Sequence, residues 1–167
     1  MTSLPPPSFE SKVCPLDQIA TRIAKLPRPL VFTNGVFDIL HRGHASYLAQ
    51  ARALGASLVV GVNSDASVKM LDKGDDRPIN SEADRQALLA ALERVDMAVL
   101  FIEQTPVNLI EKIRPDIYVK GGDYRPETLD SRERAVLTAV GAKVRILPFV
   151  KGFSTTRLIG RIRRAGC

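Results

Sequence analysis

The chain has 167 residues, of which 45% are hydrophobic and 25% charged, a balance typical of one α/β domain with a substantial core. This composition excludes a disordered or collagen-like chain, and two cysteines are too few for a disulfide scaffold. No apolar run approaches the roughly 20 residues that a membrane helix needs. The 24 basic and 18 acidic residues give a net charge of +6, which favours an anionic partner, although the absence of Trp argues against stacking on nucleic acid.

The N-terminal segment divides into an arm and a helix. Residues 1–15 contain four prolines and are predicted to form an irregular arm. Apolar residues recur at helical spacing over residues 16–26, and Pro27 stops that helix. We therefore expect an N-terminal arm and helix over residues 1–29 and the main domain over residues 30–167 of a single-domain chain. The arm lacks the pattern of a secretory signal, and the cysteines near the chain ends are expected to be free thiols, which predicts a cytoplasmic protein.

From residue 30 onward, short apolar runs alternate with helical segments. The runs are continuous, as expected of strands buried on both faces, and they cover residues 30–33, 57–62, 97–101, 117–119 and 144–147. The helical segments, bounded by capping residues, prolines and glycines, cover residues 45–54, 81–92, 106–114, 131–140 and a stretch that starts near 154. This alternation predicts an α/β fold, a Rossmann-like parallel five-stranded sheet with helices on both faces.

The segment that follows the first predicted strand carries the only two histidines, His41 and His44. Ligands of such sheets bind beyond the carboxyl ends of the strands, and a spacing of three places both rings on one face of a helical turn. Gly35 and Gly43 allow close backbone approach. Three interpretations remain open: structural histidines at a helix start, a zinc site completed by Asp38, or imidazoles that donate to a phosphoryl group.

The second predicted strand ends in a polar cluster that includes Asn63 and Asp65. Three basic residues follow it in a segment predicted as a loop: Lys69, Lys73 and Arg77. This segment is either a solvated charged loop or a mobile basic lid that closes on phosphates.

Two later strand ends also carry ligand-type residues. The fourth leads into Lys120, Gly121 and Asp123, where the glycine suits a close backbone approach and the carboxylate can accept from ribose hydroxyls, although any tight turn uses such residues. The fifth leads into three hydroxyl residues at a helix start. These residues are Ser154, Thr155 and Thr156. Helix capping explains one hydroxyl, and the three together also suit the binding of a phosphate. The chain contains neither a P-loop motif nor a Gly-x-Gly-x-x-Gly motif after the first strand, which argues against both of those site classes.

Two of these motifs carry a resemblance to a known family. The run from Gly35 to His44 resembles the signature of the cytidylyltransferase-like nucleotidyltransferases, and Ser154–Thr156 resembles their second signature. The match continues in order over most of the chain. Asn63 with its neighbours, the Arg77-Pro78 pair and the Lys-Gly-Gly-Asp-Tyr string are similar to the branch that acts on D-glycero-β-D-manno-heptose 1-phosphate. No kinase domain precedes the match, so the chain resembles the stand-alone form.

The resemblance implies transfer of AMP from ATP to the heptose 1-phosphate, which gives ADP-heptose and pyrophosphate for lipopolysaccharide core precursors. Alternatives are a cytidylyltransferase acting on glycerol 3-phosphate or a similar acceptor, a non-catalytic nucleotide-sensing module, and a metallohydrolase. Mg²⁺ would arrive with ATP, with no metal site built from protein ligands alone. At least a homodimer is expected, and neither nucleic acid nor membrane is an expected partner.

The resemblance also implies residue roles. Residues expected to stabilise the transferred and leaving phosphates are His41, His44, Lys69 and Arg77. Those expected to bind the nucleotide are Asn34, Gly35, Phe37, Asp38, Gly43, Lys73, Lys120, Gly121, Asp123, Ser154, Thr155 and Thr156. Those expected to bind the acceptor are Asn63, Asp65 and Arg85. Asp38 is also expected to shape its loop, and Arg85 has a structural ion pair as its alternative role.

Overall fold

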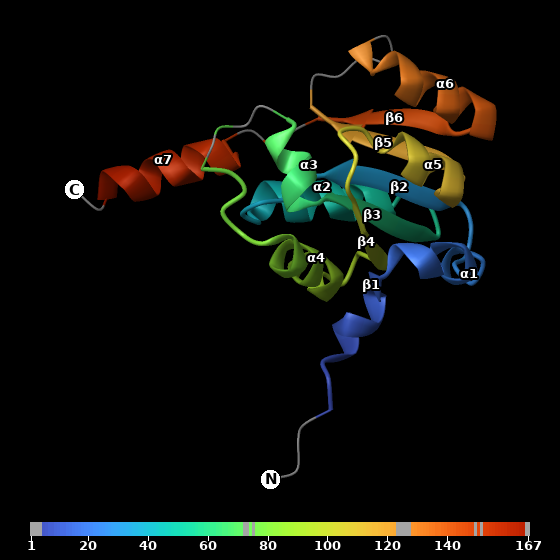
Figure 1. Ribbon diagram of the computed structural model, residues 1–167, viewed down its shortest axis with the longest axis horizontal. Coiled ribbons are helices and arrows are strands. Elements are labelled where there is room, and N and C mark those ends of the chain that lie inside the picture. Colours follow the sequence, from blue (N-terminus) through green and yellow to red (C-terminus); the bar gives the residue numbers. More distant parts are fainter. Residues whose placement is uncertain are drawn as a thin grey trace.

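Six parallel strands form the central sheet of the computed structural model, which describes residues 5–71, 74, 76–122, 128–148, 150 and 152–165 (Figure 1). Their order across the sheet is β1-β4-β3-β2-β5-β6. The strands are β1 (Val13–Cys14), β2 (Leu30–Gly35), β3 (Ser57–Asn63), β4 (Met97–Phe101), β5 (Ile117–Gly121) and β6 (Lys143–Leu147). The chain builds the sheet in one direction from β2 to β4 and then returns to the other side of β2 with β5. The topological switch point therefore lies between β2 and β5, where such folds bind ligands.

Helices cover both faces of the sheet, as the sequence predicts. They are α1 (Ile19–Ile23), α2 (Arg42–Arg52), α3 (Asp65–Lys69), α4 (Glu82–Ala91), α5 (Val107–Ile113), α6 (Ser131–Val140) and α7 (Thr155–Ala165), with 3₁₀ helices at Ser8–Lys12 and Leu16–Gln18. One apolar core joins the sheet to α1, α5 and α6, and the other joins it to α2 and α4. Successive residues of β2 enter opposite cores, which explains why its apolar run is continuous rather than alternating.

The prediction of five strands is wrong, because the sheet has a sixth strand, β1, at its edge. Val13 pairs with Ala98 and Cys14 with Val99, so part of the predicted irregular arm is a parallel strand. Two residues are too short to produce a recognisable apolar run, and the flanking prolines are tolerated because an edge strand needs few ladder donors. Cys14, a free and buried thiol, belongs to the same core as α1 and α5.

Local signals placed most helix ends correctly. Ser81 accepts a hydrogen bond from the Asp84 amide at the start of α4, and Gly141 ends α6 with a φ of +76°. The five-residue helix α3 was not predicted, since the sequence indicated a loop around Lys69. The predicted helix over residues 16–26 is a 3₁₀ turn followed by the short α1. Among the described residues, no helix is long and apolar enough to cross a membrane.

Candidate active site

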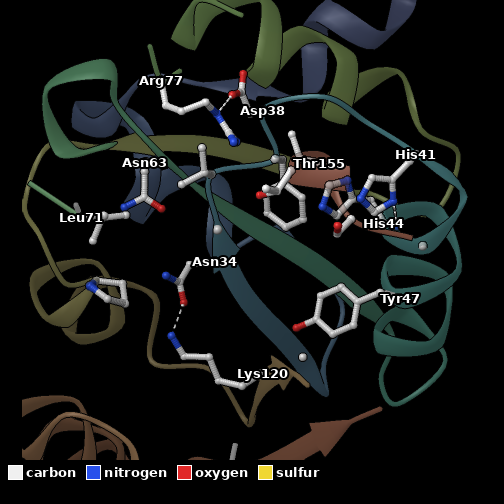
Figure 2. Close-up of a pocket in the computed structure, with 18 of the residues that line it drawn as sticks. Asn34, Asp38, His41, His44, Tyr47, Asn63, Leu71, Arg77, Lys120 and Thr155 are labelled. Atoms are coloured by element: carbon white, nitrogen blue, oxygen red, sulfur yellow. Dashed lines mark hydrogen bonds and ion pairs between the residues drawn. The ribbon is translucent and has the colours of Figure 1, made fainter. Parts of the chain in front are cut away.

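A cavity of about 880 Å³ opens at the carboxyl ends of the strands, beside the switch point (Figure 2). Most of the residues selected from the sequence line it. These are Asn34, Gly35, Phe37, Asp38, His41, Gly43, His44, Asn63, Arg77, Lys120, Gly121, Ser154, Thr155 and Thr156. They come from the ends of β2, β3 and β5, from the start of α2 and from the start of α7, so distant segments meet in one site.

Three predicted site residues do not line this cavity. Lys69 is exposed at the end of α3. The Arg85 side chain has no solvent exposure, and its Nη2 donates to Asp65 Oδ1 at 2.8 Å. Its other nitrogens donate to the Val36 and Asn80 carbonyls at 2.7 and 3.1 Å. Asp65 and Arg85 therefore form an ion pair, which is the structural role that the sequence allowed for Arg85 as an alternative. Lys73 and Asp123 lie outside the described residues.

The two histidines form a stacked pair at the start of α2. Their ring centroids lie 3.8 Å apart with an interplanar angle of 13°. His41 is the N-cap residue, and its Nδ1 accepts from the His44 amide at 3.3 Å. The neutral His41 ring therefore carries its proton on Nε2. The Phe37 ring packs edge-on against His44 at 5.3 Å. His44 Nδ1 is buried and has no hydrogen-bond partner among the described residues.

Both rings are neutral at pH 7. Burial, followed by the neighbouring charge of His41, lowers the pKa of His44 to about 4. Burial also lowers the pKa of His41 below its ordinary value. Gly43 allows His41 and Phe153 to pack closely, because a Cβ there would lie 3.0 Å from both the His41 ring and Phe153 Cβ. The site therefore presents neutral imidazole donors rather than two cations.

Asp38 holds the segment that carries Arg77. Its fully buried carboxylate accepts from Arg77 Nε and from the backbone amides of Ile79 and Asn80 at 2.8 and 2.9 Å. Burial alone would raise the pKa of Asp38, but these hydrogen bonds and the arginine charge outweigh it and lower the pKa. Figure 2 shows the carboxylate directed at Arg77 rather than at the histidines. The described residues contain no group of three His, Cys, Asp or Glu side chains that could hold a metal ion, so the zinc interpretation gains no support.

A hydrogen-bonded cluster lines the cavity at the switch point. Asn34 Oδ1 accepts from Tyr118 at 2.8 Å. It also accepts from Lys120 Nζ at 3.2 Å (Figure 2). Glu133 Oε2 lies 3.0 Å from the Tyr118 hydroxyl and 3.3 Å from Lys120 Nζ. Burial lowers the pKa of Lys120, although Glu133 opposes that shift. Because Asn34 Oδ1 is occupied by two donors, its amide NH₂ is the group left to meet a ligand.

Sequence reasoning missed several lining residues that lie on helices, at helix caps or in the segments before α5 and α7. They are Tyr47, Gln104, Thr105, Pro106, Asp130, Arg132, Glu133 and Phe153. Burial raises the pKa of Tyr47 to about 12, so its hydroxyl stays protonated. The one usable signal was Gln104-Thr105-Pro106, which follows β4 just as the other selected segments follow their strands.

The comparisons with known proteins agree with this architecture. Residues 32–161 match the model of the cytidylyltransferase-like family. The chain belongs to the cytidylyltransferase-like family. The "D-beta-D-heptose 1-phosphate adenylyltransferase" of Bordetella bronchiseptica is 54% identical over 158 residues, which cover 93% of this chain and 96% of that relative. The "Bifunctional protein HldE" of Campylobacter fetus is 48% identical, but this chain spans only 32% of its length.

Two solved structures have a fold similar to that of this chain. A lipopolysaccharide core biosynthesis protein from Thermoplasma volcanium is 34% identical, with a TM-score of 0.60 over 74% of this chain and 98% of the other. Pantothenate synthetase from Thermus thermophilus has a TM-score of 0.59 at 16% identity, over 88% of this chain and 67% of the other, and supports the fold alone. The resemblance inferred from the sequence motifs is confirmed.

Proposed function

We propose that this chain transfers AMP from ATP to D-glycero-β-D-manno-heptose 1-phosphate, giving ADP-heptose and pyrophosphate for lipopolysaccharide core precursors. The observation that carries the proposal is the 54% identity to the Bordetella adenylyltransferase over nearly the whole of both chains. The cavity supports it, because both family signatures, His41–His44 and Ser154–Thr156, face the same space.

The geometry favours in-line transfer without a general base. A phosphate oxygen of the sugar attacks the α-phosphorus of ATP, and the bond to the bridging oxygen of pyrophosphate breaks. The attacking oxygen is already anionic at neutral pH, so no side chain has to remove a proton. Neutral His41 and His44 suit this step, since they donate hydrogen bonds to the α-phosphoryl oxygens as charge develops there.

Other cavity residues position the two substrates. Ser154, Thr155 and Thr156 at the start of α7 offer hydroxyls and free amides to the triphosphate. Arg77, held by Asp38, also lines the cavity and offers a positive charge to the phosphates. Asn34, Lys120 and Asn63 offer donors to the sugar phosphate or the ribose. Holding both substrates in line is the main catalytic contribution of such a site.

Mg²⁺ enters this proposal as part of the ATP substrate. The described residues offer no cluster of three metal-ligating side chains, and Asp38 is occupied by Arg77 and two amides. The phosphate oxygens of ATP and water supply the octahedral ligands that Mg²⁺ prefers. We further propose a cytoplasmic enzyme that is at least a homodimer.

The test is pyrophosphate release by the purified chain with Mg²⁺, in which ATP and CTP are each crossed with the β-heptose 1-phosphate and with glycerol 3-phosphate. We expect release only from ATP with the heptose phosphate. Release only from CTP with glycerol 3-phosphate would overturn the acceptor and nucleotide assignments and keep the site. Nucleotide binding without any product would favour the sensing module. As an internal check, His44→Ala should lower turnover about 10²–10³-fold, whereas Arg164→Ala on α7 should not.

A further inference from the structure

A buried carboxylate, Glu133, lies in the first turn of α6 and lines the active-site cavity. Its side chain is 8% exposed, and its Oε2 lies 3.0 Å from the Tyr118 hydroxyl and 3.3 Å from Lys120 Nζ. A carboxylate in such a place keeps its charge only where donors and an opposite charge replace the water that it has lost. Lys120 supplies that charge, so the two side chains form one unit at the switch point.

Glu133 holds the Lys120 ammonium in one place. A lysine side chain is long and flexible, so it samples many rotamers unless contacts fix its end. Lys120 Nζ lies 3.2 Å from Asn34 Oδ1 on β2 and 5.3 Å from the centroid of the Tyr118 ring on β5, and Glu133 on α6 supplies the only carboxylate of this cluster. Burial lowers the pKa of Lys120, and the charge of Glu133 opposes that shift. Glu133 therefore both positions the ammonium and favours its charged form.

Lys120 in turn sets the orientation of the Asn34 amide. An ammonium group has only donors, so the amide turns its oxygen toward Lys120 Nζ and its NH₂ group away from it. The Tyr118 hydroxyl alone would not fix this orientation, because a hydroxyl can donate or accept. It also has a single proton for two acceptors, Asn34 Oδ1 at 2.8 Å and Glu133 Oε2 at 3.0 Å. Removing the charge of Glu133 should therefore loosen both Lys120 and the Asn34 amide.

We propose that Glu133 is a positioning residue for the acceptor: through Lys120, it directs the Asn34 NH₂ group and a positive charge at the phosphate of the incoming sugar. This inference rests on the proposed function. Figure 2 shows Asn34 and Lys120 beside each other and apart from the histidine pair, which binds the triphosphate in that proposal. The nucleophile of an in-line transfer enters opposite the leaving group, so the acceptor phosphate belongs on the Asn34 side. Adenine and ribose are uncharged and would not require the ammonium.

The test is the steady-state rate of pyrophosphate release by Glu133→Gln, with the β-heptose 1-phosphate and ATP varied in turn. Glu111→Gln is the matched control, because it makes the same change at an exposed residue of α5 that does not line the cavity. In Glu133→Gln, we expect the KM for the sugar phosphate to rise about tenfold, the usual effect of losing one charge-assisted hydrogen bond, and the KM for ATP to change less than about twofold. Glu111→Gln should match the wild type in both constants.

A double-mutant cycle separates positioning through Lys120 from a purely structural role. In the Lys120→Met background, Glu133→Gln should not raise the KM for the sugar phosphate further, because the group through which Glu133 acts is absent. A further rise of about tenfold in that background would overturn the proposal. An unchanged KM for the sugar phosphate in Glu133→Gln, or an equal rise in both KM values, would also overturn it. If circular dichroism shows that Glu133→Gln does not fold, Glu133→Asp undergoes the same comparison of KM values, since it lengthens the contact and keeps the charge.

Calorimetric binding of the β-heptose 1-phosphate distinguishes a failure of this inference from a failure of the proposed function. The wild-type chain should bind the sugar phosphate about tenfold more tightly than Glu133→Gln does. Transfer of AMP by the wild type together with equal affinity in the two proteins would overturn the positioning role and keep the proposed function. A difference in affinity without any transfer from ATP would overturn the proposed function and keep the role of Glu133 in binding the sugar phosphate.

Discussion

Replacing Asp38 with asparagine should destabilise the protein strongly while leaving its side-chain volume almost unchanged. The Asp38 side chain has no solvent exposure, and that of Arg77 has only 10%. The amide of asparagine removes the negative charge and directs one NH₂ group at a donor. Breaking a buried ion pair by removing one partner costs about 3–5 kcal/mol. Because Arg77 lines the cavity and meets solvent there, we expect the lower end, about 3 kcal/mol.

The assay is urea unfolding followed by circular dichroism at pH 7 and at pH 3. Asp96→Asn is the matched control, because Asp96 also accepts from an arginine and a backbone amide but is 32% exposed, with Arg52 28% exposed. An exposed pair of this kind contributes about 1 kcal/mol or less. The free energy of unfolding should therefore fall about three times as far in Asp38→Asn as in Asp96→Asn.

The pH dependence provides the result that would refute this reasoning. The folded-state pKa of Asp38 is lowered, so its charge stabilises the folded chain above the ordinary aspartate pKa, and that contribution is lost as the pH falls through the folded-state pKa. The difference between wild type and Asp38→Asn should shrink as the pH falls below the ordinary aspartate pKa, because the unfolded chain then binds a proton that folded Asp38, with its lowered pKa, still resists. A loss that is equal at pH 7 and pH 3, or below about 1 kcal/mol at pH 7, would show that Asp38 does not anchor Arg77.

Three further predictions follow from the described contacts. An NMR titration should give His44 a pKa of about 4 in the free protein and a higher value with a non-hydrolysable ATP analogue. Because the folded-state pKa is lowered, the free energy of unfolding should fall as the pH drops from about 6.5 toward 4. The variant His44→Gln should lack that part of the loss. Arg85→Met should lower the free energy of unfolding by about 3–5 kcal/mol, because Asp65 and two carbonyls lose a fully buried partner, as urea unfolding will measure. Gly55→Ala should lower the free energy of unfolding by about 1–3 kcal/mol, because the new Cβ would lie 2.4 Å from the Pro29 carbonyl oxygen. Gly160→Ala on α7 is the control: its Cβ would lie 3.5 Å from its nearest neighbour, and it should not lower the melting temperature.

The sequence was sufficient to locate the part of the cavity that the strand ends form. Polar residues that directly follow buried strands must meet at one sheet edge when the strands are parallel, whatever their separation along the chain. Asn34, Asn63 and Lys120 were found in this way, and all three line the cavity. That inference needs only the strand pattern, which is visible in the sequence, and the general right-handedness of parallel crossovers.

Residues that reach the cavity from helices could not be found by the same reasoning. Glu133 lies in the first turn of α6, where an acidic residue is already explained by the helix dipole. Its contact with Lys120 depends on how α6 packs over β5, which no local pattern encodes. The role of Arg85 could not be decided from the sequence either. Its three acceptors come from separate segments, and a charged residue in a sequence does not reveal whether such acceptors surround it.

The histidine pair shows why the structural and the phosphate-binding interpretations were not true alternatives. His41 caps α2 through Nδ1, which satisfies the structural interpretation. That same hydrogen bond fixes the ring and leaves the proton on Nε2, so the cap prepares the donor that a phosphoryl group requires. Burial lowers the pKa of both rings and so favours their neutral forms, and an uncharged donor suits a step whose nucleophile arrives as an anion. One local structure at the start of α2 thus serves both the stability of the helix and the proposed chemistry.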